Sequence, residues 1–215
     1  MNTYGARCAR LVFGLFLFAL GSYLIIRANI GLAPWEAFTL GISYHTDLSY
    51  GVVIIVTGIL ILVVDWKLGE KIGVGTILNT LLIGAFVDAI HYSGVVPRMG
   101  SFFSGLVMLL AGQVTICFAS YFYIGVGLGC GPRDALMVAF RKRLPNVPVG
   151  VVRGAIEGTV LLVGWLLGAK IGLGTVISVF GIGFIIQAVF SALKFDVAGV
   201  NHESVGYTLS KLEWR

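Results

Sequence analysis

The sequence predicts an all-α membrane protein, a polytopic bundle of transmembrane helices formed by two internal repeats. The first observation behind this prediction is composition. Hydrophobic residues make up 58% of the 215 residues, and the mean hydropathy is +0.97, far above the averages of soluble proteins. The second observation is that several apolar runs approach the roughly 20 residues that a helix needs to cross a bilayer. The third is that the second half of the chain repeats the first.

The repeat is visible in two pairs of matching segments. Residues 22–37 recur 98 positions later as residues 120–135, with Ser, Tyr, Ile, Gly, Pro and Ala in the same places. Residues 66–76 recur 99 positions later as residues 165–175. Duplicated units of this kind commonly form a central site between the helices of a membrane protein.

Six long apolar segments are the predicted spans, and no other segment is long enough to form a separate soluble domain. The spans lie at about residues 10–28, 50–66, 75–92, 102–125, 149–166 and 175–193. We therefore expect a single membrane domain over residues 1–215, with repeat 1 at about 10–92 and repeat 2 at about 102–194. The polar residues 195–215 are expected to form a short, mobile cytoplasmic tail.

Each repeat also contains a short apolar segment that follows a glycine-rich stretch and begins with proline, at residues 34–46 and 132–143. Proline is well tolerated at the first position of a helix, because its missing N–H would have no partner there. At about 1.5 Å per residue, such a helix covers only about 20 Å of the roughly 30 Å hydrocarbon core. Each repeat should therefore hold three long spans and one short helix.

The short helices allow two topologies. If they are re-entrant, the chain crosses the membrane six times, and most basic residues lie at cytoplasmic ends, with Arg27, Arg98 and Lys170 outside. If they cross, there are eight crossings and a weaker charge asymmetry. The re-entrant topology is favoured, since three spans per repeat is an odd number and turns the two repeats in opposite directions. Both topologies place the N- and C-termini in the cytoplasm.

Several other classes of protein are not indicated. The net charge of +5 does not predict nucleic-acid binding, because the basic residues lie at the ends of apolar segments. Cys8, Cys117 and Cys130 lack metal-ligand spacing, and no enzyme motif or cofactor fingerprint is present. The Gly-x-Gly-Thr segments that end at Thr76 and Thr175 are too short for a phosphate loop, so we expect turns with threonine as the N-cap of the next span.

Four motifs suggest a family. They are GLAPWE at 31–36, GLGCGPRD at 127–134, and Ile-Gly-x-Gly-Thr at 72–76 and 171–175. With these motifs the chain resembles the YczE/YyaS/YitT group of bacterial integral membrane proteins over about residues 10–194. Ala33 and Glu36 depart conservatively from the Gly-Leu-Gly-Pro-Trp-Asp form of YczE-like members. The resemblance implies a multi-pass protein of the bacterial plasma membrane and no settled activity.

Two acidic residues, Glu36 and Asp134, occupy equivalent positions two residues after the proline that starts each short helix. A purely structural interpretation is that free N–H groups and the positive helix end stabilise these carboxylates. A functional interpretation is that both acids meet between the repeats and bind a cation or a proton. If the first turns are open instead, their amides could receive an anion, with Arg133 adding charge.

Three further charged residues lie within or near the ends of spans. Arg153 and Glu157 are four residues apart, so they share a helix face that should point to the protein interior or to a water-filled cavity. Repeat 1 has an isoleucine and a glycine at the equivalent positions, so the pair is specific to repeat 2. Asp88, with His91 one helical turn away, is a candidate for a proton relay, or it simply reaches the interface.

The leading functional interpretation is a transporter or permease of a small solute or ion. Its site would lie between the short helices, with Glu36, Arg133 and Asp134 in contact with the solute and Arg153 and Glu157 alongside. The alternative is a non-transporting protein that stabilises or regulates another membrane protein through its helix faces. Under either interpretation, the expected partners of the chain are the lipid bilayer, a small solute or ion, and a second copy or another membrane protein. A cavity that reaches Glu157 would favour transport, and an exposed stripe of small residues would favour the partner role.

Overall fold

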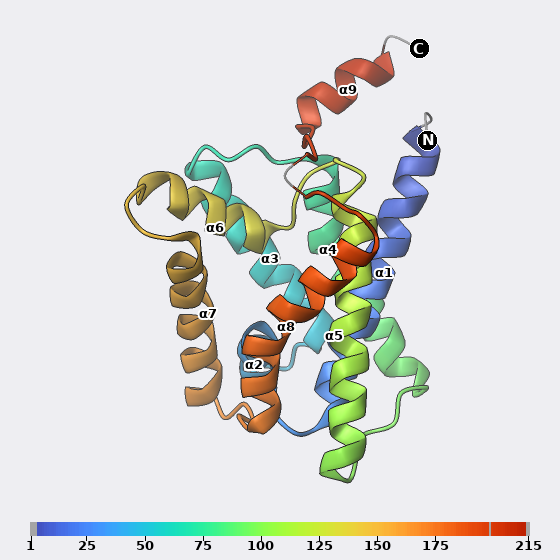
Figure 1. Cartoon of the computed structure of the whole chain (residues 1–215), viewed down its shortest axis with the longest axis vertical. Helices are drawn as coiled ribbons and strands as arrows, with labels where there is room; N and C mark the ends of the chain where they lie inside the picture. The colour runs from blue at the N-terminus through green and yellow to red at the C-terminus, as the bar shows by residue number, and fades with distance from the viewer. Residues whose placement is uncertain (1–3, 198, 214–215) are drawn as a thin grey trace.

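The computed structural model describes residues 4–197 and 199–213, and the described chain is a bundle of helices (Figure 1). The helices are α1 (Tyr4–Ala28), α2 (Pro34–Ser43), α3 (Tyr50–Lys67), α4 (Val74–Ser93), α5 (Phe102–Ile124), α6 (Pro132–Arg143), α7 (Val149–Leu166), α8 (Leu173–Ala192) and α9 (Val205–Glu213). By length and composition, six of them (α1, α3, α4, α5, α7 and α8) can cross a membrane. The predicted all-α membrane fold with six apolar spans is therefore confirmed.

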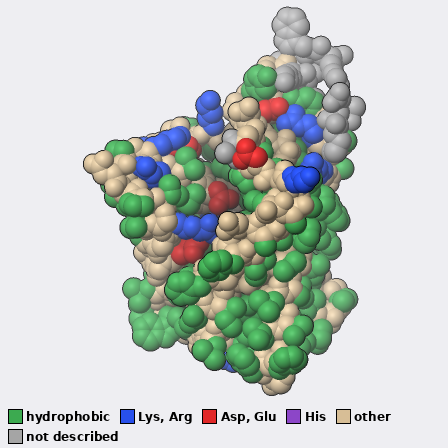
Figure 2. All heavy atoms as spheres, in the orientation of Figure 1, with side chains coloured by type: hydrophobic (Ala, Val, Ile, Leu, Met, Phe, Trp, Pro, Cys, Tyr) green, Lys and Arg blue, Asp and Glu red, His purple; other side chains and the backbone are tan. Residues whose placement is uncertain are grey.

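The surface of the bundle is apolar over the outer faces of α5 and α8, as a membrane protein requires (Figure 2). Phe103 on α5, and Phe180 and Phe184 on α8, are each at least 70% exposed. Large side chains of this kind are stable in lipid, whereas in water they would cause aggregation.

Helices α1 and α5 occupy equivalent places in the two repeats and form the most extensive helix contact of the bundle. Figure 1 shows that they run in opposite directions, as do α3 and α7. Glycine lets the α1 and α5 backbones approach closely, since a Cβ atom on Gly21 would lie 2.7 Å from the carbonyl oxygen of Gly112. Substitution of Gly21 would therefore force the two central helices apart.

Loop contacts define two ends of the bundle. At the first, which we call the tail end, Arg7 donates to the carbonyl of Val126, and Val205 donates from its backbone to Ile72. At the opposite end, the far end, the backbone N–H of Met99 donates to Arg27, and the ammonium of Lys170 donates to Asn29. The long helices run between these two ends.

Both short helices enter and leave at a single end. The loop before α6 is bound at the tail end, where Leu128 accepts from Gly75, and the last residue of α6, Arg143, donates to the carbonyl of Leu68 at the same end. Residues that flank α2 on both sides, Leu32 and Tyr44, line one cavity at the far end. This placement is the one expected of re-entrant short helices, and six helices are long and apolar enough to cross a membrane.

The glycine-rich loop before each short helix docks on the Gly-x-Gly-Thr turn of the other repeat. Gly75 donates to the carbonyl of Leu128 over 2.7 Å, and Gly174 donates to the carbonyl of Ile30 over 2.9 Å. In both bonds the glycine of the turn donates, and the acceptors, Leu128 and Ile30, are equivalent residues of the two repeats. Gly31 needs to be glycine here, because its φ is +133° and a Cβ would lie 2.7 Å from the backbone nitrogen of Thr175.

The predicted N-cap role of the two threonines is wrong by three residues. Gly73 and Gly172 are the N-caps of α4 and α8, and each lacks a side chain that could cap the helix. The hydroxyls of Thr76 and Thr175, in the first turn, instead accept from the backbone N–H of the preceding N-cap glycine, each over 3.2 Å. This is the reciprocal half of a capping box, which stabilises the same turn from inside the helix.

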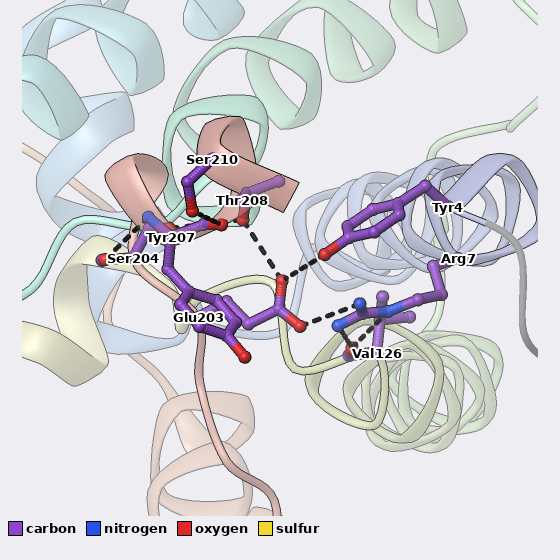
Figure 3. A network of polar contacts seen from close by, with 8 residues as sticks. All are labelled: Tyr4, Arg7, Val126, Glu203, Ser204, Tyr207, Thr208 and Ser210. Carbon is purple, nitrogen blue, oxygen red and sulfur yellow. Dashed lines mark hydrogen bonds and ion pairs between the residues drawn. The ribbon is translucent and has the colours of Figure 1, made fainter. Parts of the chain in front are cut away.

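The tail is docked on the bundle, contrary to the expected mobile segment (Figure 3). Glu203 accepts hydrogen bonds from Arg7 over 2.9 Å and from the Tyr4 hydroxyl over 3.3 Å, and its backbone donates to Gly127. The side chain of Thr208 in α9 binds the same carboxylate. A charge-assisted bond with a half-buried arginine explains why a polar tail stays in contact with α1 and with the loop before α6.

We expect Glu203→Gln to release the tail. Burial alone would raise the pKa of Glu203, but the hydrogen bond and charge of Arg7, with the Thr208 and Tyr4 hydroxyls, lower it overall. Docking should therefore be complete above the ordinary glutamate pKa of 4.5 and weaken as the pH falls through the lower value in the docked state. The mobility of a spin label at Ser210→Cys tests this, with Glu70→Gln as the control. A label that stays immobile in Glu203→Gln at neutral pH would contradict it.

Candidate functional site

A side chain from the first turn of each short helix reaches the other. Trp35 of α2 and Arg133 of α6 are equivalent residues of the two repeats, and the guanidinium carbon of Arg133 lies 4.4 Å from the centre of the indole ring. A guanidinium over an indole face is held by a cation–π interaction. One long side chain from the first turn of each short helix therefore joins the two repeats.

A cavity of about 210 Å³ lies beside this contact. Its charged lining residues are Arg133 and Asp134 from α6, and Arg153 and Glu157 from α7. Figure 2 shows basic and acidic side chains gathered in a hollow between α6, α7 and α8. Polar lining is completed by Asn79 of α4 and by residues of α5, so both repeats contribute to the walls.

The charges in this cavity neutralise one another in part. The Nε atom of Arg153 donates to Glu157 over 2.8 Å, and the two side chains are 55% and 21% exposed. The Tyr123 hydroxyl donates to Asp134 over 3.2 Å. Arg153 and Arg133 both act electrostatically on the Asp134 carboxylate. Four of the five charged residues that the sequence suggested for a binding site thus line a single cavity, and the fifth, Glu36, does not.

Glu36 lies behind this cavity rather than in its wall. It is only 6% exposed, and its carboxylate accepts from the hydroxyl of Ser22 in α1 over 2.8 Å. Asp134 likewise accepts from a hydroxyl of the preceding span. The acids are thus bound across helices, and the first turns of α2 and α6 start at Ala33 and Gly131 without a capping side chain. Of the two acids, only Asp134 lines this cavity.

Asp88 belongs to the far end and has a capping contact. Its carboxylate accepts from the backbone N–H of Gly51 over 2.8 Å and from the hydroxyl of Ser49, at the start of α3. His91 instead pairs with the Tyr23 hydroxyl over 3.0 Å. Asp88 and His91 thus have different partners, and the capping bonds account for Asp88 without proton transfer.

Two residues at the site, and one buried acid elsewhere, were missed in the sequence. Trp35 and Tyr123 had no signal beyond their aromatic character, because only packing shows which charged groups they touch. Asp65 did have one, as an aspartate among apolar residues near the end of α3. It is 1% exposed, and within the described part of the chain neither carboxylate oxygen has a hydrogen-bond partner. Repeat 2 has Gly164 at the equivalent position.

Comparisons with known proteins agree with the sequence resemblance. Residues 5–191 match DUF6198, described as a family of unknown function. An uncharacterized protein of Haemophilus influenzae is 33% identical over 177 residues, which cover 82% of this chain and 80% of that protein. The uncharacterized membrane protein YczE of Bacillus subtilis is 32% identical over 178 residues, covering 81% and 80% of the two chains. No solved structure gives a significant match.

Proposed function

Since the chain belongs to the DUF6198 family and is related to the membrane protein YczE, and neither name states an activity, we propose its function from the geometry of the site. The chain is a transporter or permease of a small solute or ion, and its binding site is the cavity between the two short helices. This proposal starts from the multi-pass membrane architecture of the chain. It adds a path for a solute through the helix bundle.

The observation that supports this proposal is the meeting of charged residues from α6 and α7 in one internal cavity. Glu157 lies about halfway along α7. Charges at such a depth are costly in lipid, and in membrane proteins they usually mark an ion or substrate pathway. Broken or re-entrant helices whose positive ends face a central site are the recurrent way to build such a pathway.

The chemistry of the lining residues suits a small polar solute or an ion. Asp134 and Glu157 can bind a cation or a proton, and Arg133 and Arg153 can bind an anionic group. Arg153 is 55% exposed and therefore free to exchange Glu157 for a solute. Helix α7 packs mainly against the short helices α2 and α6, so a movement of either short helix would also displace the ion pair.

Flux into liposomes tests the proposal. Purified protein in vesicles should support the uptake of at least one member of a broad panel of ions and small polar solutes, above the level of protein-free vesicles. Uptake should saturate, because the solute occupies a site. A panel without any protein-dependent flux would contradict transport.

We further propose that the protein resides in the bacterial plasma membrane with its tail end in the cytoplasm. The tail end holds most of the basic residues, including the run at 141–143 that ends α6, as the positive-inside rule requires. In a background without the native cysteines, Pro145→Cys should react with an impermeant thiol reagent only from the cytoplasmic side. Asp47→Cys should react only from outside. The reverse pattern would invert the proposed orientation.

A regulatory partner role has one observation in its favour. Gly150, Gly154 and Gly158 form a stripe along α7, and a Cβ atom added to any of them would meet no atom within 4 Å. Small-residue stripes allow close helix association in membranes. This role would be preferred if the flux panel is negative and the protein co-purifies with another membrane protein unless Gly154 is replaced by leucine.

A further inference from the structure

A second cavity, of about 400 Å³, opens at the far end and has none of the charged residues of α6 and α7 in its lining. We call it the Asn29 cavity. Its basic lining residues are Arg27, Arg98 and Lys170, and its acidic lining residue is Asp88. The three basic residues come from the end of α1, the loop after α4 and the loop after α7. They are the basic residues that the charge pattern leaves on the outer side of the membrane, where positive charge is least expected.

Asn29 gathers two of these cations. Its side-chain oxygen accepts from Arg98 over 2.9 Å and from Lys170 over 3.1 Å. Its backbone oxygen accepts from Lys170 over 3.0 Å, and its side-chain nitrogen donates to the carbonyl of Met99 over 3.1 Å. The amide side chain therefore positions an arginine and a lysine at the rim of one cavity.

The backbone at Asn29 explains why an amide residue occupies this position. Its φ is +59°, in the left-handed region, where glycine and asparagine are the favoured residues. The equivalent residue in repeat 2 is Gly127, with a φ of +71°. Backbone geometry alone is thus satisfied by glycine. Asparagine adds the side chain that organises the cations, and it does so only in repeat 1.

The positive charge of this cavity outweighs its negative charge, because three basic residues and one acidic residue line it. Among the described residues, none of Arg27, Arg98 and Lys170 forms an ion pair with a carboxylate. Arg27 donates to the carbonyl of Val96, and its guanidinium lies 5.8 Å from the centre of the Tyr23 ring. Asp88 is already bound to the start of α3. Three cations against one carboxylate leave a net positive charge, which attracts an anion.

We propose that the Asn29 cavity binds an oxyanion, a phosphate or carboxylate group, presented at the outer side of the membrane. Arg98 and Lys170 bind the group directly through those of their N–H donors that are not bonded to Asn29. Arg27 adds positive charge from the cavity wall. A guanidinium and an ammonium together suit the planar or tetrahedral oxygens of such a group. The group can be part of a soluble anion or of a lipid head group, since both present the same oxygens. This binding needs no transport, so it is independent of the flux screen.

Inorganic phosphate is the first probe. Full-length protein in a neutral detergent should bind phosphate saturably in calorimetric titrations, with an affinity that falls as ionic strength rises. Arg98→Gln and Lys170→Gln should each weaken binding by about tenfold, the usual consequence of losing one charge-assisted hydrogen bond. Arg141→Gln, a basic residue of the tail end, is the control and should leave the affinity unchanged. Equal affinities in all these proteins would overturn the proposal.

A lipid probe distinguishes the two sources of the anion. The protein is placed in nanodiscs of phosphatidylcholine with and without phosphatidylglycerol, and bound lipid is measured by native mass spectrometry. Retention of phosphatidylglycerol that depends on Arg98 and Lys170 assigns the cavity to a lipid head group. Phosphate binding that phosphatidylglycerol does not compete with assigns it to a soluble anion. Failure of both probes to bind at these residues would refute the site.

The Asn29→Gly variant distinguishes a loss of anion binding from a loss of folding. Glycine accepts the backbone geometry, as at Gly127, and the variant keeps all three cations while removing the side chain that holds them together. We expect an unchanged melting temperature and an anion affinity several-fold weaker than in the wild type. A stable Asn29→Gly variant with full affinity would show that the amide does not organise an anion site.

Discussion

Removal of the α7 ion pair, by Arg153→Ile together with Glu157→Gly, is expected to leave a stable protein without flux. Repeat 1 has Ile54 and Gly58 at the equivalent positions of α3, so a helix in the corresponding place of the fold carries both residues. The pair lines the central cavity instead of the packed core, and Arg153 is 55% exposed. Its loss should therefore affect solute binding far more than stability. Liposome flux and thermal unfolding in detergent measure the two effects separately.

The matched control is the ion pair between Lys142 and Glu70, which has a similar length, 2.7 Å, and lies at the tail end. Its double glutamine variant should keep normal flux. The single variant Arg153→Ile should also lose flux, because it leaves the Glu157 carboxylate without its partner. Full activity in the Arg153→Ile and Glu157→Gly double variant would remove the pair from the solute path.

Asp134→Asn and Glu36→Gln are expected to have opposite effects, although the two acids hold equivalent places in the repeats. Asparagine at 134 can still accept from Tyr123, but it removes a charge from the cavity wall, so flux should be abolished with little change in stability. Glutamine at 36 keeps an acceptor for Ser22 outside the cavity. That variant should retain flux and lose about 1 kcal/mol of stability, since a charge-assisted bond becomes a neutral one.

Flux and unfolding measurements on the two single variants decide this comparison. Loss of flux in Glu36→Gln would show that the buried acid takes part in the solute path after all. Normal flux in Asp134→Asn would exclude the carboxylate of α6 from solute binding.

The sequence was sufficient for the helices and for the charged residues that line the central cavity. Hydropathy placed the third element at residues 50–66, and α3 covers Tyr50–Lys67. The repeat located both short helices from their prolines, and the helical spacing of Arg153 and Glu157 put them on one face. These properties depend on local sequence and on its duplication, so they can be predicted without knowledge of helix packing.

What the sequence left undetermined depends on contacts between distant segments. Equivalence in the repeat suggested that Glu36 and Asp134 face the same site, but Ser22 holds Glu36 against α1 while Tyr123 holds Asp134 beside the cavity. The docked tail requires a partner nearly the whole chain away, Arg7 for Glu203. No local pattern reveals which helix face a neighbour covers, so such contacts appear only in the folded protein.

The accessibility of Met137 tests the central claim most directly, because this residue of α6 lines the central cavity. In a background without the three native cysteines, Met137→Cys should react with a small, membrane-impermeant thiol reagent from either side of the vesicle, since a transport site must open to both sides. The reaction should also stop flux. Leu144→Cys, in the exposed loop after α6, is the control and should react from the tail side alone. Reaction of Met137→Cys from one side only, or from neither, with flux unchanged, would contradict a solute path between the two short helices.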